Sequence, residues 1–306
     1  MPRVTVLLTC YNHLDFLPAC LDSVRAQTYQ DYEIIVLDDG SVDGTREYLA
    51  RLPADPQMKI VLNEKNLGTY GTLNAGLHLA KGELVAILND DDVWEPEKLA
   101  QQVDLLDANP RVGLVHTNGA FIDGSGARVE GEPLGFEFPR TETGDVYLDL
   151  VYANKIIASA VLVRRECFDS LGLFNPDYFG SGDWEMWLRI AEKWDVGYID
   201  ERLTYYRVHG TNASHNLEKI WKDDERLRIW LDERLAHPKK SYGTTMLQKA
   251  RAHNLACLGT VLTLNGHPKA GRNAYARSLH LDPGRWRSRL RWIATFLPKS
   301  WFRRLL

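Results

Sequence analysis

The stretch Leu84-Val85-Ala86-Ile87-Leu88-Asn89-Asp90-Asp91-Asp92 joins an apolar run to one amide and three consecutive carboxylates. Its five apolar residues have the length and composition of a buried β-strand. A second apolar run, at residues 32–37, is also followed by acidic sequence, Asp38-Asp39-Gly40-Ser41-Val42-Asp43-Gly44. Two buried strands that end in carboxylates predict a sheet with one strongly acidic edge.

Apolar runs alternate with helical patterns along this part of the chain. Strands are expected at residues 4–9, 32–37, 58–62, 84–88 and 112–116, with helices between them. The last of these helices is expected to open at Glu95-Pro96, with proline in its first turn. The alternation predicts an α/β fold with a mostly parallel sheet flanked by helices. Because parallel strands end at one edge, the two acidic stretches should meet there.

The remainder of the chain divides into three parts. Residues 119–144 are rich in Gly, Pro and charge and are expected to form a loop that can act as a lid. An apolar segment at 156–163, a helix from about Asp183 and a strand at 203–208 continue the α/β pattern, and helices follow from about Leu217. We therefore expect a boundary near Ser214, with an α/β domain at 1–214 and a helical extension at 215–306.

The composition is that of a globular protein. Hydrophobic residues make up 44% and charged residues 25% of the 306 positions, which argues against long disorder. The cysteines (Cys10, Cys20, Cys167 and Cys257) form no C-x-x-C pair, so neither a zinc site nor a disulfide framework is indicated. The sequence lacks a signal-peptide pattern and any apolar run of about 18 residues. The expected location is the cytoplasm.

Clustered carboxylates cost free energy unless cations or hydrogen-bond donors offset their repulsion. A divalent cation with oxygen ligands is the simplest explanation, and such a cation can hold a diphosphate. The alternative is structural, because Asp, Ser and Gly after a strand also form turns and cap helices, as Asp43 before Gly44-Thr45 could do. Two acidic stretches at one edge favour the cation.

Several motifs resemble, in the same order, those of the family 2 glycosyltransferases. They are Thr9-Cys10-Tyr11-Asn12, Asp38-Asp39-Gly40-Ser41-x-Asp43-Gly44-Thr45, Asn66-Leu67-Gly68 with Asn74-x-Gly76, Asn89-Asp90-Asp91-Asp92-x-Trp94-x-Pro96-x-Lys98-Leu99, Gly182-Asp183-Trp184-Glu185-x-Trp187-Leu188-Arg189 and Tyr206-Arg207-x-His209. The resemblance covers residues 3–214 and implies the GT-A type of nucleotide-diphosphosugar-binding fold.

The resemblance also assigns roles to individual residues. Contacts with the nucleotide sugar are expected from Thr9, Tyr11, Asn12, Asp39, Gly68, Asn74 and Asp90. Asp91 is the expected principal metal ligand, with Asp92 and His209 also assigned to Mn²⁺ or Mg²⁺. For His209 a diphosphate contact or a purely structural role stays open. Asp183 is the expected catalytic base, with helix capping as its alternative role.

The chain departs from the family pattern at three positions. Asn89 stands where family members carry the first acid, although Asp90-x-Asp92 restores that spacing one position along. Gly182 replaces the Glu that commonly precedes the base, and Leu73 replaces a frequent Arg. Arg189 is expected to form an ion pair, and the tryptophans of this motif to pack in the core or to line an acceptor pocket.

The function implied by the resemblance is inverting transfer of a sugar from a UDP- or dTDP-sugar to a hydroxyl of a glycan or lipid-linked acceptor, in cell-surface glycan synthesis. Two other classes stay open. A nucleotidyltransferase uses a similar sheet with acidic ligands, although no Gly-rich basic loop for a triphosphate is present near the N-terminus. A non-catalytic glycan- or nucleotide-binding module would also keep the fold, although Asp183 argues against it.

Charge is distributed unevenly along the chain. No acidic residue follows Asp282, whereas seven basic residues do, interleaved with aromatic residues. In a helix over 286–297, Trp286, Leu290, Ile293 and Leu297 would share one face. Two interpretations stay open: this helix lies on an anionic membrane, at the inner face of the cytoplasmic membrane, or it docks on the acidic rest of the protein. That acidic rest argues against nucleic acid as a partner.

A helical hairpin is expected just before the basic segment. Leu258-Gly259, Gly266, Tyr275 and Pro283 have spacings similar to a tetratricopeptide helix pair over about 252–283. Because a solenoid needs several repeats, one copy indicates a hairpin packed on the core or against a second subunit.

Overall fold

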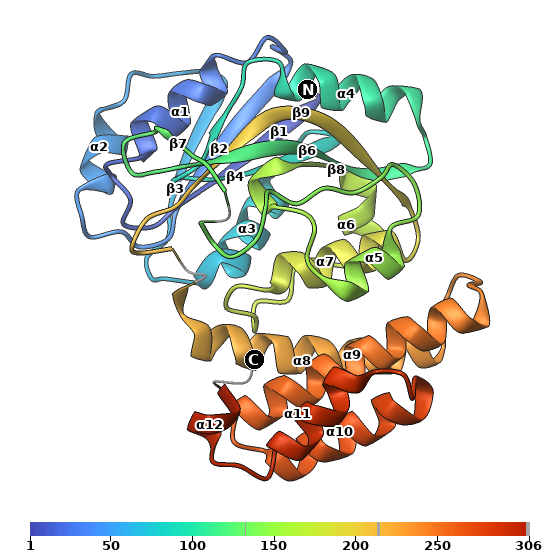
Figure 1. The fold of residues 1–306 in the computed structure, drawn as a ribbon. Coiled ribbons are helices and arrows are strands. Elements are labelled where there is room, and N and C mark those ends of the chain that lie inside the picture. Colours follow the sequence, from blue (N-terminus) through green and yellow to red (C-terminus); the bar gives the residue numbers. More distant parts are fainter. Residues whose placement is uncertain (132, 213–214, 304–306) are drawn as a thin grey trace. The chain divides into compact units, whose positions relative to one another are not determined.

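The computed structural model describes residues 1–131, 133–212 and 215–303 (Figure 1). The chain divides into two compact units. The first consists of residues 1–146, 154–178 and 182–212, and the second of 147–153, 179–181 and, among the described residues, 215–303. The boundary expected near Ser214 falls outside the described residues.

The first unit is built on one sheet. Its strands are β1 (Val4–Cys10), β2 (Tyr32–Asp38), β3 (Met58–Leu62), β4 (Leu84–Asn89), β5 (Val93–Trp94), β6 (Val112–Ile122), β7 (Arg128–Val129), β8 (Val161–Arg164) and β9 (Asp195–Arg207). They lie in the order β3-β2-β1-β4-β8-β6-β9-β5, with β7 paired to β6. β1, β2, β3 and β4 pair in parallel. β8, however, lies between β4 and β6 and runs antiparallel to both, so the sheet is more mixed than the alternation predicts. The α/β class is confirmed.

The helices of this unit alternate with the strands. They are α1 (Leu17–Arg25), α2 (Thr45–Arg51), α3 (Gly68–Leu79), α4 (Lys98–Ala108), the 3-10 helix η1 (Ala158–Ala160), α6 (Arg165–Leu171) and α7 (Gly182–Ala191). α1 buries Leu17, Cys20, Leu21 and Val24, which recur at helical spacing and pack against apolar residues of β1 and β2. α4 begins two residues after Pro96, so the proline precedes the helix instead of lying in its first turn.

Strand register brings the acidic stretches together. Thr9 of β1 pairs with Asn89 of β4, and Cys10 pairs with Asp38 of β2. The segments that follow β1, β2 and β4 therefore leave the sheet at one edge, as the alternation predicts.

Part of the expected loop at 119–144 is strand instead. β6 continues to Ile122, and β9 starts at Asp195, ahead of the predicted strand start at 203. The two strands pair over most of their length, with irregular register on both sides of Asn118. Gly119 allows this pairing, because a Cβ there would collide with the carbonyl oxygen of Thr204.

The second unit is helical, which confirms the predicted extension. It contains α5 (Tyr147–Tyr152), α8 (Leu217–Ala236), α9 (Thr244–Leu264), α10 (Pro268–Leu281), α11 (Trp286–Ala294) and α12 (Lys299–Arg303). α9 and α10 pack closely at Gly259, where a Cβ would lie 2.8 Å from the Tyr275 ring. Among the described residues, no helix is both long and apolar enough to cross a bilayer.

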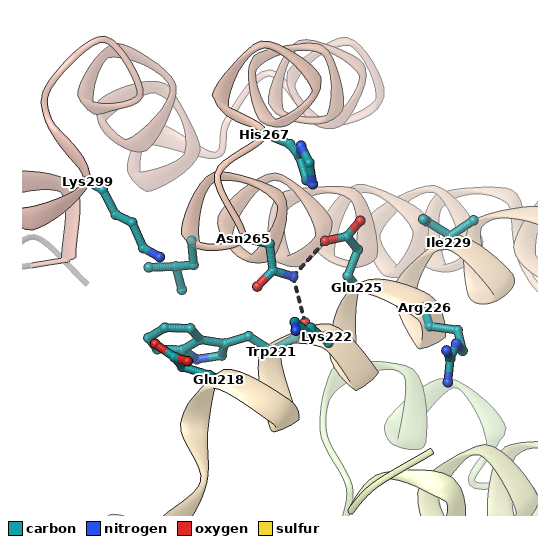
Figure 2. A pocket seen from close by; sticks show the side chains of 10 residues that line it. Glu218, Trp221, Lys222, Glu225, Arg226, Ile229, Asn265, His267 and Lys299 are labelled. Atoms are coloured by element: carbon teal, nitrogen blue, oxygen red, sulfur yellow. Dashed lines mark hydrogen bonds between the residues drawn. The ribbon is translucent and has the colours of Figure 1, made fainter. Parts of the chain in front are cut away.

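A pocket of about 540 Å³ lies within the second unit (Figure 2). Its walls come from α8, the start of α12 and the turn between α9 and α10. Asn265 on that turn donates hydrogen bonds to the Trp221 carbonyl oxygen and to Oε2 of Glu225. All residues that line this pocket belong to the second unit, whereas the acidic residues after β2 and β4 belong to the first.

Candidate active site

Two carboxylates of the first acidic stretch hold the local backbone. Asp38 is fully buried, accepts hydrogen bonds from the amides of Gly40 and Ser41, and pairs with Nε of Arg46 at 2.7 Å. Asp43 accepts from both the amide and the hydroxyl of Thr45, at the start of α2. These two aspartates therefore have the structural role that turn and capping residues commonly have.

Asp39 joins the end of β2 to the start of α3. Its Oδ1 accepts from the Leu67 amide at 2.7 Å, and its Oδ2 accepts from the Gly68 amide at 2.9 Å. Gly68 has φ +76°, which favours glycine. The N-terminus of α3 stabilises the Asp39 carboxylate. Asp39 and Gly68, both expected to contact the nucleotide, therefore lie together at the sheet edge.

The loop after β1 is tied to both acidic stretches. The Thr9 hydroxyl donates to Oδ1 of Asn89 at 3.3 Å, and the Tyr11 amide donates to Oδ2 of Asp90 at 2.9 Å. Asn12 adopts a positive φ of 56°, and its Oδ1 accepts from the Val42 amide. The Tyr11 side chain is 46% exposed. Its ring is therefore free to contact a ligand at this edge.

Asp90 fixes a histidine that motif reasoning did not select. Oδ1 of Asp90 lies 2.9 Å from Nδ1 of His13. Burial raises the pKa of Asp90, aided by the charge of Asp91 and opposed by the hydrogen bond to His13. Burial lowers the pKa of His13, but the bond to Asp90 and the nearby carboxylate charges outweigh it and leave that pKa raised.

Three side chains form a group that could hold a metal ion. Ligand atoms of His13, Asp91 and His209 all lie within 4.8 Å of one another. Nε2 of His209 is 3.0 Å from Oδ2 of Asp91. Two imidazoles and one carboxylate form a donor set that suits Mn²⁺. The residues present therefore fit a divalent cation, and two of them, Asp91 and His209, were predicted ligands.

Asp92 does not join this group. It is fully buried, and its Oδ1 accepts from the Arg207 amide at 2.9 Å. Burial raises the pKa of Asp92 well above its usual range, and the charge of Asp91 adds to the increase. The Arg207 guanidinium in turn donates to the carbonyl oxygen of Asp91 at 2.8 Å. These bonds hold the end of β4 against the end of β9.

Asp183 lies in the first turn of α7. Its Oδ1 accepts from the Trp184 amide at 2.7 Å and from the Tyr70 hydroxyl at 3.4 Å, and the Asn154 side chain also hydrogen-bonds to it. Burial raises the pKa of Asp183 to about 6, and these hydrogen bonds oppose the increase. A carboxylate with this pKa is ionised at neutral pH and is still a competent proton acceptor.

The residue before Asp183 explains one departure from the family pattern. A Cβ at Gly182 would lie 2.7 Å from the Tyr70 ring. The glycine therefore leaves the space that Tyr70 occupies beside Asp183. A glutamate at this position would displace the ring.

Asn74, Arg189 and Trp187, which belong to the family motifs, make structural contacts within the protein. Both polar atoms of the Asn74 amide bond the backbone of Phe174, Nδ2 to its oxygen at 2.8 Å and Oδ1 to its amide at 3.0 Å. Asn74 was expected to contact the nucleotide sugar, and its observed contacts are with the protein. Arg189 forms the predicted ion pair, with Glu185 at 2.8 Å, and Trp187 is fully buried.

Residues 5–171 match the family model for glycosyl transferase family 2, which is more than half of the chain. The chain belongs to the family 2 glycosyltransferases. Membership in this enzyme family decides against the two other classes, a nucleotidyltransferase and a non-catalytic binding module.

Curated relatives of this glycosyltransferase are found in several bacteria. An uncharacterized glycosyltransferase of Nostoc sp. is 30% identical over 220 residues, which are 69% of this chain and 66% of that protein. The UDP-Glc:alpha-D-GlcNAc-diphosphoundecaprenol beta-1,3-glucosyltransferase WfaP of Escherichia coli is 28% identical over 221 residues, 71% of this chain and 81% of that protein.

Solved structures share the fold of this glycosyltransferase. S. aureus TarS, in complex with UDP-GlcNAc, superposes with a TM-score of 0.71 at 15% identity, covering 100% of this chain and 90% of that one. The mannosyltransferase PcManGT from Pyrobaculum calidifontis, in complex with GDP-Man and Mn²⁺, gives 0.61 at 20% identity, covering 99% and 86%. At these identities the likeness shows the GT-A type fold alone.

Three residues of the candidate site, His13, Tyr70 and Asn154, were not predicted from the sequence. His13 follows the Tyr11-Asn12 motif directly, so the loop at the end of β1 was the available signal. Tyr70 lies in α3, where an aromatic residue is typical of a core position, and no pattern connects it or Asn154 with Asp183.

Proposed function

We propose that this glycosyltransferase moves a sugar from a UDP- or dTDP-sugar to a hydroxyl of a glycan or lipid-linked acceptor, with inversion at the anomeric carbon. The observation that carries the proposal is Asp183, a carboxylate with a pKa raised to about 6 by burial and oriented by Tyr70. Support for the donor comes from the UDP-GlcNAc bound by TarS. The name of WfaP supports a lipid-linked acceptor.

The proposed reaction is a single displacement. The acceptor oxygen forms a bond to the anomeric carbon, while the bond from that carbon to the diphosphate oxygen breaks on the opposite face. The proton of the acceptor hydroxyl passes to the carboxylate of Asp183, which acts as general base. Because attack and departure occur on opposite faces, the anomeric configuration inverts. The hydrogen bonds from Trp184 and Tyr70 to Oδ1 orient the carboxylate for this transfer.

We propose that Asp91, His209 and His13 hold a divalent cation, Mn²⁺ or Mg²⁺. When bound, this cation would stabilise negative charge on the departing diphosphate. Asp90 orients His13 through Nδ1, and Nε2, which lies 3.5 Å from the Thr211 hydroxyl, is the proposed ligand atom. Arg207 holds the backbone of Asp91 and Asp92. The predicted ligand role of Asp92 requires its carboxylate to turn from the Arg207 amide.

The nucleotide is proposed to bind at the edge formed by the loops after β1, β2 and β4. Its proposed contacts are Thr9, Tyr11, Asn12, Asp39, Gly68 and Asp90. Residues 1–214 are the proposed catalytic domain, and 215–306 the helical extension. The proposed acceptor class fits an enzyme of surface-glycan synthesis that acts in the cytoplasm, at the inner face of the membrane.

A donor-release assay tests the proposal. The purified protein is incubated with a panel of nucleotide sugars and Mn²⁺, with and without EDTA, and free nucleoside diphosphate is quantified. Chelator-sensitive release from one donor is the expected result and identifies that donor. Absence of release, together with absence of nucleoside-diphosphate binding by calorimetry, would overturn the proposal. Proton NMR of the product then reports whether the anomeric configuration has inverted.

A further inference from the structure

Large apolar side chains are exposed along α11 and the segment that follows it. Between residues 286 and 301, six of them have 44–64% of their surface exposed. They are Trp286, Leu290, Ile293, Phe296, Leu297 and Trp301. Exposed apolar residues are ordinary when they are isolated, but a contiguous group of aromatic and aliphatic residues marks an interaction surface. We call these six residues the aromatic surface.

The segment is anchored to the second unit by other side chains. α11 buries the small residues Ser288 and Ala294. Phe302 of α12 is fully buried in a cluster with Ala294 and Tyr275. Lys299 and Arg303 lie over the Trp221 ring, and Figure 2 shows Lys299 beside it. The segment therefore packs through its small residues and Phe302, and its largest apolar side chains face outward.

The cations of this segment lack acidic partners. Within the part of the chain that the structure describes, no basic side chain from Arg285 to Arg303 forms an ion pair with a carboxylate. Arg287 lies on the Trp286 ring, and Arg289 donates to the Pro283 carbonyl oxygen. A helix docked on acidic protein surface would bury its apolar face and pair its arginines. This segment does neither, which argues against docking on the acidic part of the chain.

We propose that the aromatic surface, together with the exposed Arg287 and Arg289, binds an anionic lipid bilayer. Exposed Trp, Phe and Leu side chains can enter the boundary between headgroups and acyl chains, and arginines interleaved with them are attracted to anionic headgroups. A second copy of the chain fits this surface less well, because a two-fold contact would bring identical cationic patches together. The inference does not depend on the donor sugar or the acceptor.

Co-sedimentation with vesicles tests the inference on the full chain. The probes are phosphatidylcholine vesicles with and without phosphatidylglycerol. The chain is expected to sediment with the anionic vesicles only, and less at 1 M salt, where the Debye length is about 3 Å. Arg287→Gln and Arg289→Gln together should weaken binding on the order of 25-fold, at about fivefold for each arginine. Trp286→Ser with Ile293→Ser should weaken it at least about tenfold.

Substitutions are preferred to truncation, because removing residues after Gly284 would also remove Ala294 and Phe302 from their buried cluster. A matched control replaces exposed residues elsewhere in the second unit, Lys249→Gln, Lys269→Gln and Met246→Ser, and should leave sedimentation unchanged. Unchanged thermal melting of every variant shows that folding is intact.

Equal binding to neutral and anionic vesicles, or none to either, would overturn the proposal. So would concentration-dependent dimerisation abolished by the Trp286→Ser and Ile293→Ser substitutions, without vesicle binding.

Discussion

Nε2 of His209 lies 3.0 Å from Oδ2 of Asp91, although the two residues are 118 positions apart in the sequence. Two further bonds maintain this approach, from the Arg207 amide to Asp92 and from its guanidinium to the Asp91 carbonyl oxygen. The end of β4 is thereby fixed to the end of β9. These two bonds, each between a backbone group and a side chain, position the pair of candidate ligands.

Replacing His209 should weaken cation binding. We expect His209→Ala to raise the Kd for Mn²⁺ by at least about 10- to 100-fold, because loss of residues that only support a ligand already costs this much. Calorimetric titration with Mn²⁺ alone measures the effect. His78→Ala, at an exposed position in α3, is the matched control and should bind as the unsubstituted chain does. Equal affinity in the two variants would remove His209 from the ligand set.

Replacing Asp183, the proposed base, should slow turnover strongly while leaving donor binding intact. We expect Asp183→Asn to lower kcat by about 100- to 10,000-fold, the usual contribution of a positioned general base. Nucleoside-diphosphate binding should stay within about twofold, a change of only about 0.4 kcal/mol, since Asp183 is not among the proposed nucleotide contacts. Single-turnover kinetics and calorimetry separate the two effects. Retained turnover would show that another group accepts the proton.

The pH dependence of turnover should report the pKa of Asp183. The ionised carboxylate is the active form, and its pKa is raised to about 6. The rate should therefore be constant above this pH and fall about tenfold per unit below it. A profile of kcat from pH 5 to 8 at saturating donor, acceptor and metal measures this limb. A flat profile would contradict the role of Asp183.

Removing the Tyr70 hydroxyl should move this acidic limb upward. The hydroxyl donates a hydrogen bond to the ionised Asp183 and lowers its pKa. One hydrogen bond contributes about 0.5–1.5 kcal/mol, so Tyr70→Phe should raise the apparent pKa by up to about one unit. Because a purely structural role of Tyr70 would lower stability without moving this limb, the pH profile distinguishes the two roles. Tyr48→Phe, in α2, serves as the control substitution.

Substitution of Asn74 distinguishes a structural role of this side chain from a contact with the nucleotide. We expect Asn74→Ala to lower the free energy of unfolding by about 1–3 kcal/mol, because the Phe174 backbone loses both of its bonds to the amide. Donor affinity should change little. Urea unfolding and nucleotide calorimetry measure the two quantities. A large loss of donor affinity with unchanged stability would instead support the nucleotide contact that the motif predicts.

The parts of the fold that the sequence predicts are those where one local pattern decides the structure. β1, β2 and β4 are buried on both faces, so their continuous apolar runs mark them as parallel strands. The second half of β6 escaped prediction because Thr117, Asn118 and Gly119 interrupt its apolar run. Pairing with β9, a non-local contact, makes this segment a strand.

The candidate site also contains residues that local motifs predict and residues that only non-local contacts bring together. Asp91, His209 and Asp183 belong to motifs that can be read along the chain, so their candidacy was predictable. The contact between Tyr70 and Asp183 joins residues 113 positions apart and depends on the packing of α3 against α7. Periodicity records which face of a helix is apolar and carries no information on such a pair.

The burial of Asp183 also affects the stability of the fold. A carboxyl group whose pKa rises from 3.8 to about 6 on folding binds protons more tightly in the native state. The free energy of unfolding therefore decreases as pH rises through this interval, by about 3 kcal/mol in total. At neutral pH the native protein is less stable than it would be with a neutral amide at this position. With Asp183 in its proposed role as base, activity and conformational stability oppose each other at this residue, and the Asp183→Asn variant should melt at a higher temperature than the unsubstituted chain.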